Sequence, residues 1–318
     1  MGIAEVIPGV SGGTIAFITG IYKTLLDSIK SVDGEFLQLL SKFKLGAVWQ
    51  KINGPFLLWL FGGMIGGVII GVFGVTYFLE NYPEVLWALF FGLILGSVPM
   101  MLSQIRSVDI KSIALFIIGT IFAFGITSLN PMSGSENYLF IYVAGVIAIS
   151  ALVLPGISGS FMLLLMGLYS TIIPTIKSFL KSPELSEFIL LAVFGLGILT
   201  GLVLFSRLVS AAFEKYHDGT IALMSGFMLG SLNKIWPWRN IETILDKRTH
   251  DLVSVSPETI ANIDLTADYV KVVKEKNVFP GEYFSDSNLL PVALAFALGL
   301  AMMLIIHKSG LMKNGMEE

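Results

Sequence analysis

Two short motifs in this sequence combine residues that break helices with residues that bind anions. The first reads PGVSGGT from Pro8, and the second reads PGISGS from Pro155. Proline blocks the helix behind it and glycine permits a tight turn, so each motif predicts a turn that opens a new helix. Free N–H groups at a helix N-terminus, with serine hydroxyls beside them, form an anion site that needs no fixed cation.

We therefore predict a binding site for an anionic substrate built from both turns. Its residues are Pro8, Gly9, Ser11, Gly12, Gly13 and Thr14 from the first turn, and Pro155, Gly156, Ser158, Gly159 and Ser160 from the second. The alternative is that the small residues only let helices pack closely. We prefer that alternative for GGMIGGVIIGVFG at 62–74, where the spacing is helical and no polar group accompanies the glycines.

The composition requires these turns to lie among membrane helices. The chain has 318 residues, of which 54% are hydrophobic and 14% charged. Its uncharged runs are 57–79, 85–103, 112–130, 137–176, 188–206 and 289–306. A bilayer core needs about 20 apolar helical residues. The sequence therefore predicts an all-α polytopic membrane protein.

Several classes of function are excluded. The chain has no cysteine, so disulfides and thiolate chemistry are absent, and its three histidines stand beside charged residues at or outside the ends of apolar runs. We predict no metal and no cofactor. The net charge of −3, without a basic patch, excludes nucleic acid as a partner. A cleavable signal peptide is not expected, because Glu5 and a Pro-Gly turn occupy the place of its positive start.

Two ionisable residues are candidates for roles near the turns. Glu5 precedes Pro8 by three residues, and Leu152 takes that place before Pro155. A carboxylate within the membrane is a candidate proton carrier, which makes Glu5 the predicted coupling residue, whereas at a solvated chain start it has no such role. Arg207 follows the uncharged run 188–206 and either reaches inward to bind the anion or snorkels to the interface.

The two motifs belong to a longer internal repeat. Ala4–Ser31 aligns without a gap on Ala151–Ser178, with identical residues at twelve of the 28 positions. Further along, FFGLILGSVP (Phe90–Pro99) matches MSGFMLGSLN (Met224–Asn233). Two matches in the same order indicate a tandem duplication.

Each repeat is predicted to hold a re-entrant Pro-Gly hairpin and three transmembrane helices. The first repeat covers 1–134, with its hairpin at 4–26 and helices near 56–79, 85–103 and 112–130. The second covers 135–318, with its hairpin at 137–176 and helices near 188–212, 219–236 and 289–306. Because a hairpin adds no net crossing, three helices invert the second copy relative to the first. Inverted repeats are typical of transporters that alternate access around a midplane site.

The loop charges predict the orientation. Most Lys and Arg residues lie in 23–55, 104–111, 207–218 and the C-terminal tail. By the positive-inside rule these segments are cytoplasmic, as are both termini, in a multi-pass protein of the cytoplasmic (inner) membrane. The motif IWPW (Ile235–Trp238) is typical of an interfacial anchor.

Two segments stand outside the repeat plan. The polar insert 237–288 is expected outside the cell, with one surface helix over 257–277. An apolar stretch precedes the second motif, whereas its counterpart in the first repeat falls before Met1. We therefore expect a short helix ahead of Met1.

At this point the sequence resembles a known family. GIAEVIPGVSGGTIAFITGIY, LPGISGSFMLLLMGLY and GFMLGSLNKIWPW are similar to segments of the bacterial and archaeal polyprenyl-phosphate transporters of the PopT type, once a domain of unknown function. The resemblance runs over essentially the whole chain. It implies that the substrate is undecaprenyl phosphate, returned from the outer to the cytoplasmic leaflet for cell-envelope synthesis. The family usually has Asp at the position of Glu5.

Two other functions were weighed. A membrane phosphatase for undecaprenyl pyrophosphate also uses inverted hairpins, but its motif has an arginine where Gly12 and Gly159 stand, and its pair of glutamates is absent here. Phosphoryl transfer would then lack its cation and its acid–base group, so we expect no enzyme. A carrier of small inorganic anions needs a sealed, hydrated pore, which Gly-rich faces open to lipid do not favour. The expected partners are undecaprenyl phosphate and membrane lipids, with protons as the coupling ion.

Overall fold

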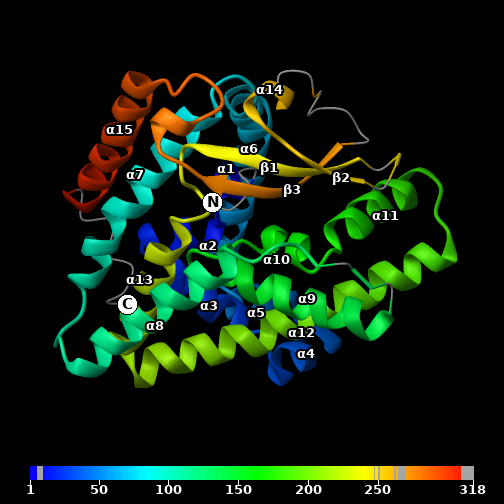
Figure 1. Cartoon of the computed structure of the whole chain (residues 1–318). Helices are drawn as coiled ribbons and strands as arrows, with labels where there is room; N and C mark the ends of the chain where they lie inside the picture. Colours follow the sequence, from blue (N-terminus) through cyan, green and yellow to red (C-terminus); the bar gives the residue numbers. More distant parts are fainter. Residues whose placement is uncertain are drawn as a thin grey trace.

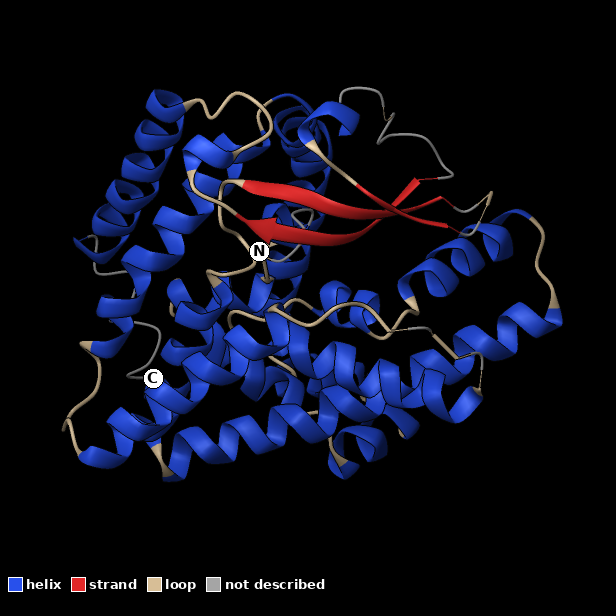
Figure 2. Ribbon diagram, in the orientation of Figure 1, coloured by secondary structure: helices blue, strands red, loops and turns tan. Residues whose placement is uncertain are grey.

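The architecture comes from a computed structural model (Figure 1). It describes residues 1–5, 10–132, 134–135, 137–246, 248–249, 251–260, 263 and 270–308. Nearly all of this part of the chain is helical apart from one small sheet (Figure 2).

Five helices in the described part of the chain are long and apolar enough to cross a bilayer. They are α6 (Gly54–Asn81), α7 (Pro83–Leu102), α8 (Ile110–Thr127), α12 (Leu185–Lys215) and α15 (Leu289–Lys308). Four of them are mostly exposed, and the apolar span of α6 is only 6% buried, whereas half of the apolar window of α7 is buried. Apolar helix surfaces left uncovered on this scale require lipid around them, so the prediction of a helical multi-pass membrane protein is confirmed.

Shorter helices surround the two turns. Before α6 come α1 (Gly2–Glu5), α2 (Gly12–Ile18), α3 (Tyr22–Lys30), α4 (Gly34–Ser41) and α5 (Leu45–Lys51). Before α12 come α9 (Tyr138–Val153), α10 (Gly159–Leu165) and α11 (Tyr169–Lys181). The apolar helix α9 leads into the second turn, and α10 returns from it packed against α9. The axes of α10 and α11 then differ by 111°.

Helix α13 (His217–Ser231) is shorter than the helix expected near 219–236. After Ser231 the chain continues in turns, and Pro237 follows six residues later. The shortening has a consequence for the site, because Asn233 and Lys234 are released from the helix and lie beside the insert.

Helices α7 and α15 cross where glycines face main-chain carbonyl groups. A Cβ atom added to Gly92 of α7 would touch the carbonyl of Phe296, and one added to Gly299 of α15 would touch that of Leu89. The two backbones therefore approach as closely as small residues allow. Figure 1 shows α15 beside α7 along the same edge of the molecule.

Helices α8 and α13 cross in the same way. A Cβ atom on Gly226 of α13 would touch the carbonyl of Phe116, and one on Gly119 of α8 would touch that of Leu223. Gly226 is the residue that aligns with Gly92 in the repeat. The same set of contacts therefore joins α7 to α15 and α13 to α8.

The core lies around α2, α7 and α13. Its buried side chains include Phe17, Trp87, Met101, Met228 and Ile235. A second cluster of buried residues joins α9 to α12. Helix α2 is thus held on its apolar sides, which fixes the position of the first turn.

The insert forms an antiparallel sheet with strand order β2-β1-β3. Its strands are β1 (Arg239–Asp246), β2 (Asp251–Ser254) and β3 (Val270–Asn277), accompanied by the helical turns α14 (Pro257–Ile260) and η1 (Pro280–Glu282). Buried Ile244 of β1 pairs with Val253 on one side and Val272 on the other. Figure 2 shows the sheet as a strip along one side of the helical body.

The sheet corrects two expectations. The fold is not purely α-helical, and the helix expected over 257–277 is wrong, because 257–260 is the only described helix there and 270–277 is a strand. VKVV at the start of β3 carries β-branched valines, and Lys274 directly after it is exposed to solvent. Valine favours a strand when a partner strand is available, and β1 provides one.

Candidate functional site

The first turn leads into α2 through a serine cap. Ser11 stands at the N-cap with extended backbone, and its Oγ accepts a 3.1 Å hydrogen bond from the Gly13 N–H. Serine is favoured there because its hydroxyl satisfies an N–H group that the helix leaves without a partner. Two predicted residues of this turn, Pro8 and Gly9, lie outside the described residues.

The second turn has the same plan. Pro155 and Gly156 are buried, and Gly156 has φ +88°, the left-handed region that favours glycine. Ser158 caps α10 by accepting a 3.5 Å hydrogen bond from the Phe161 N–H, and its hydroxyl lies 2.9 Å from that of Ser160. Both turns therefore begin a helix with a serine cap.

The two turns are bonded to each other. The Ser11 hydroxyl donates to the Leu152 carbonyl at 3.2 Å, and the Gly156 N–H donates to the Thr14 hydroxyl at 2.7 Å. A Cβ atom at Gly13 would lie 2.6 Å from the Leu152 carbonyl oxygen, so the backbones approach too closely for any side chain. Ser11 and Thr14 are almost completely buried at this junction.

Protein oxygen atoms accept from the N–H groups of these turns. A Glu5 carboxylate oxygen accepts from the Gly12 N–H at 2.8 Å, beside the serine cap on Gly13 and the threonine on Gly156. A Cβ atom at Gly159 would lie 2.5 Å from the Ala148 carbonyl oxygen, so that glycine serves close packing against α9. In this conformation protein acceptors occupy the N–H groups of Gly12, Gly13 and Gly156, and further polar donors lie beside the junction.

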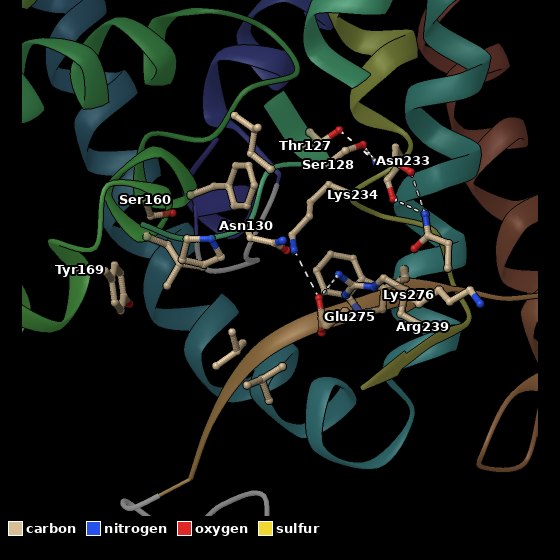
Figure 3. A pocket seen from close by; sticks show the side chains of 18 of the residues that line it. Thr127, Ser128, Asn130, Ser160, Tyr169, Asn233, Lys234, Arg239, Glu275 and Lys276 are labelled. Carbon is tan, nitrogen blue, oxygen red and sulfur yellow. Dashed lines mark hydrogen bonds and ion pairs between the residues drawn. The ribbon is translucent and has the colours of Figure 1, made fainter. Parts of the chain in front are cut away.

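Such donors line a cavity of about 710 Å³ next to the junction (Figure 3). Two of the predicted site residues, Glu5 and Ser160, line it. The remaining lining comes from Trp87 of α7, the end of α8 and the loop after it, α10, Tyr169 of α11, the chain after α13, and strands β1 and β3. In Figure 3 the side chain of Lys234 extends between Asn130 and Glu275. The insert thus forms one wall of the cavity and the second hairpin forms the opposite wall.

Two cations in the cavity share one carboxylate oxygen. Glu275 Oε2 lies 3.0 Å from an Arg239 guanidinium nitrogen and 3.3 Å from Lys234 Nζ. The side chain of Arg239 is 12% exposed and that of Lys234 23% exposed. With one anion between two cations, this corner of the cavity keeps a positive charge that a bound anion can balance.

Aromatic rings hold both cations in place. The Arg239 guanidinium stands over the Trp87 ring at 4.7 Å, and Lys234 Nζ stands 5.0 Å from the centre of the Phe161 ring. Such cation–π contacts contribute about 0.5–2 kcal/mol each. Phe161 belongs to α10, so Lys234 connects the insert side of the cavity to the second hairpin.

Glu275 is ionised in this setting. Its burial raises the pKa of the carboxyl group, but the charges of Arg239 and Lys234 outweigh that effect and hold the pKa below its ordinary value. The carboxylate therefore stays charged through the neutral range and competes with any other anion for the two cations.

Side-chain amides join the insert to the helices at the cavity wall. The Asn277 amide donates to the Asn233 main-chain oxygen at 2.8 Å, and the Asn233 amide donates to hydroxyls of Thr127 and Ser128. The Trp236 indole donates to the Val278 carbonyl at 2.9 Å. These bonds fix the sheet, and with it Arg239 and Glu275, against the membrane helices.

Arg207 is not part of this arrangement. It lies exposed on α12, with a guanidinium nitrogen 3.5 Å from the Val32 carbonyl oxygen, and it lines neither of the two described cavities. The structure thus brings Glu5, Ser11, Gly12, Gly13, Thr14 and the second turn together, and leaves Arg207 apart.

Sequence reasoning missed Lys234, Arg239 and Glu275. The two cations flank IWPW, whose tryptophans drew attention as an interfacial anchor, and Glu275 lies 36 residues after Arg239. A lysine directly after an apolar helix was the available signal. Its partner was not visible, because only the pairing of β1 with β3 places Glu275 beside it.

Comparison with known proteins gives the following findings. Residues 1–252 match the model of the undecaprenyl phosphate translocase-like family. A polyprenyl-phosphate transporter of Vibrio cholerae serotype O1 is 43% identical over 239 residues, which cover 75% of each chain. A polyprenyl-phosphate transporter of Staphylococcus aureus is 33% identical over 251 residues, which cover 74% of this chain and 83% of that protein. No solved structure matches.

Proposed function

The chain belongs to the undecaprenyl phosphate translocase-like family, and we propose that it returns undecaprenyl phosphate from the outer to the cytoplasmic leaflet. It is a polyprenyl phosphate transporter and not an enzyme, in keeping with the names of its family and relatives. Its membrane is the cytoplasmic membrane, with both termini in the cytoplasm.

The observation that carries the proposal is the pair of cations on one carboxylate. A phosphate monoester has a charge of about −1.5 to −2 at neutral pH. Moving such an anion into hydrocarbon without partners costs on the order of tens of kcal/mol. Lys234 and Arg239 are already desolvated and held over aromatic rings, and they replace the water of the headgroup when the phosphate displaces Glu275.

The polyprenyl tail does not need to enter the protein. The cavity also has an apolar lining that includes Leu164, Val272 and Val273, beside which the first isoprene units fit. The long helices present exposed apolar surfaces to the lipid. The headgroup therefore moves through the protein while the tail remains in the bilayer.

Two features support alternating access around the joined turns. The turns are bonded through Ser11 and Gly156, so a movement of one hairpin is transmitted to the other. The crossings of α7 with α15 and of α13 with α8 use equivalent residues of the two repeats. Equivalent contacts allow the two halves to exchange conformations, which is how inverted repeats open first to one face and then to the other.

We infer the direction of transport from the face of the membrane on which the Lys234 cavity lies. The Lys234 cavity is lined by 127–131 and by the insert, next to loops that are poor in Lys and Arg and therefore external. The headgroup enters there from the outer leaflet. It leaves on the side of the basic loops.

Glu5 is the proposed coupling residue. It lines the cavity and bonds to the N-terminal residue of α2, so its charge lies where a phosphate would approach the junction. A carboxylate repels that phosphate, whereas a protonated carboxyl group does not. Entry of a proton and entry of the headgroup then become one event.

The substitution Glu5→Gln tests this coupling. The amide oxygen still accepts from the Gly12 N–H, so undecaprenyl phosphate binding should remain within about twofold while the acceleration by an imposed pH gradient disappears. Transport in proteoliposomes with and without the gradient measures this. Glu5→Asp is the control and should keep the gradient dependence. A Glu5→Gln protein that still responds to the gradient like the parent would rule out Glu5 as the coupling residue.

The function itself is tested with the purified chain in liposomes. Undecaprenyl phosphate is placed in the outer leaflet, and the fraction that remains accessible to an impermeant phosphatase is followed in time. The protein should make undecaprenyl phosphate inaccessible with time. It should not cause uptake of inorganic phosphate into the liposomes. Accessibility that stays the same with and without protein would contradict the proposal, and phosphate release from undecaprenyl pyrophosphate would indicate the phosphatase instead.

A further inference from the structure

A second, smaller cavity lies at the other end of α2. Its volume is about 170 Å³, and its lining includes Phe17, Gly20, Tyr22, Lys23, Arg106 and Glu214. Helix α2 begins at Gly12, which bonds to Glu5 in the larger cavity, and nearly ends at Phe17, which lines the smaller one. The seven residues of α2 span roughly 10 Å and separate the two cavities.

The two cavities occupy equivalent places in the two repeats. In the gapless alignment of Ala4–Ser31 with Ala151–Ser178, Phe17 matches Leu164 and Tyr22 matches Tyr169. Phe17 and Tyr22 line the smaller cavity, and Leu164 and Tyr169 line the larger one. Each hairpin therefore presents the same two positions to its own cavity.

The tyrosine of the smaller cavity has an unsatisfied hydroxyl. Tyr22 is 3% exposed, and its phenolic oxygen has no hydrogen-bond partner among the described residues. Its ring packs edge-on against Phe17 and lies 6.0 Å from the ring of Phe213. Phenylalanine would fill this space without leaving a buried polar group unpaired, so the hydroxyl indicates a ligand with a polar atom.

The charges around Tyr22 fit an anionic ligand that can replace acidic side chains of the protein as the partner of the cations. Lys23 and Arg106 line the cavity together with Asp27 and Glu214. Lys30 binds two of the lining residues, Glu214 at 2.8 Å and the Ser210 hydroxyl at 3.2 Å. Both partners of this ion pair are well exposed to solvent, so the pair opens easily.

We propose that the Tyr22 cavity is a second binding site for the phosphate monoester headgroup, occupied on the opposite side of α2 from the Lys234 cavity. This inference rests on the proposed function. The residues of the Tyr22 cavity come from segments rich in Lys and Arg, 23–55, 104–111 and 207–218, and from the hairpin beside them. The headgroup leaves the protein from this site on the cytoplasmic face, with the Tyr22 hydroxyl as a donor.

The experiment uses geranyl phosphate, a short, water-soluble phosphate monoester, as a competitor added to one face. Right-side-out and inverted membrane vesicles containing the full chain transport undecaprenyl phosphate while the competitor is titrated. Tyr22→Phe should raise the half-inhibiting concentration about tenfold when geranyl phosphate is added at the cytoplasmic face, because one donor to a charged group is lost. At the external face the value should stay the same.

Tyr169→Phe is the matched variant from the other repeat, and its effect should appear at the external face alone. If Tyr22 were merely structural, Tyr22→Phe would change the protein's abundance or shift the half-inhibiting concentration equally at both faces. Either result would overturn the inference. An unchanged half-inhibiting concentration at the cytoplasmic face would overturn it as well. Failure of the proposed function is distinguishable, because the parent protein would then not transport undecaprenyl phosphate from either face.

Discussion

Arg239→Ala is expected to weaken the binding of undecaprenyl phosphate by roughly tenfold to a hundredfold. Hydrogen bonds to charged groups contribute about 1.5–3 kcal/mol, and each 1.4 kcal/mol is tenfold in affinity. Arg239 is nearly buried, stands over Trp87 and donates to the carboxylate that the phosphate would displace. Binding of the lipid to purified protein in detergent, followed by tryptophan fluorescence, measures the loss.

Two further substitutions test whether Glu275 competes with the phosphate for the two cations. Glu275→Gln removes the internal competitor for both cations and should strengthen phosphate binding severalfold while slowing release. Arg248→Ala is the control, since Arg248 follows the far end of β1 and pairs with Asp246. If Glu275→Gln and Arg239→Ala weaken binding equally, the shared carboxylate supports the fold and the headgroup binds elsewhere.

Gly13→Val should abolish transport and lower the free energy of unfolding by about 3–5 kcal/mol. Its Cβ atom would lie 2.6 Å from the Leu152 carbonyl oxygen and 2.8 Å from that of Val153, so the turns must separate. Overpacking costs about 1–3 kcal/mol, and each lost hydrogen bond adds about 1 kcal/mol. Thermal unfolding in detergent and the liposome assay measure the two effects.

Gly62→Val serves as the control for Gly13→Val. Gly62 lies on α6, where nothing stands within 4 Å of an added Cβ atom, so the same substitution should leave stability and transport close to those of the parent. If the two variants had the same stability and transport, the joined turns would tolerate separation and would not transmit movement from one hairpin to the other.

The sequence predicted the membrane helices well because their signal is local. An uncharged run of bilayer length, such as 85–103, has few alternatives to a helix, and α7 covers Pro83–Leu102. The turns were also visible, since Pro155 and Gly156 break a helix wherever they stand. Their serine caps follow from the same local chemistry.

The rest could not be predicted, because it depends on pairing between distant segments. The helix expected over 257–277 ignored the partner that β1 offers to β3. The N–H groups of the two turns were assigned to a substrate, whereas Glu5, Ser11 and Thr14 accept from three of them. The cation pair needs Lys234, Arg239 and Glu275 from three places in the chain, and no spacing in the sequence predicts that these residues lie together.

The glycine crossings divide the substitutions that this chain can accumulate into two kinds. At Gly92 and Gly226 a methyl group would meet a main-chain carbonyl of the neighbouring helix, which cannot move aside as a side chain can. At Gly62 and Gly66 on α6 the space is open, and alanine or valine would meet only lipid. Sequence drift among related proteins is therefore expected to reach Gly62 and Gly66 and to stop at the crossings. A glycine retained at position 92 or 226 records a backbone contact, whereas one retained at position 62 or 66 records none.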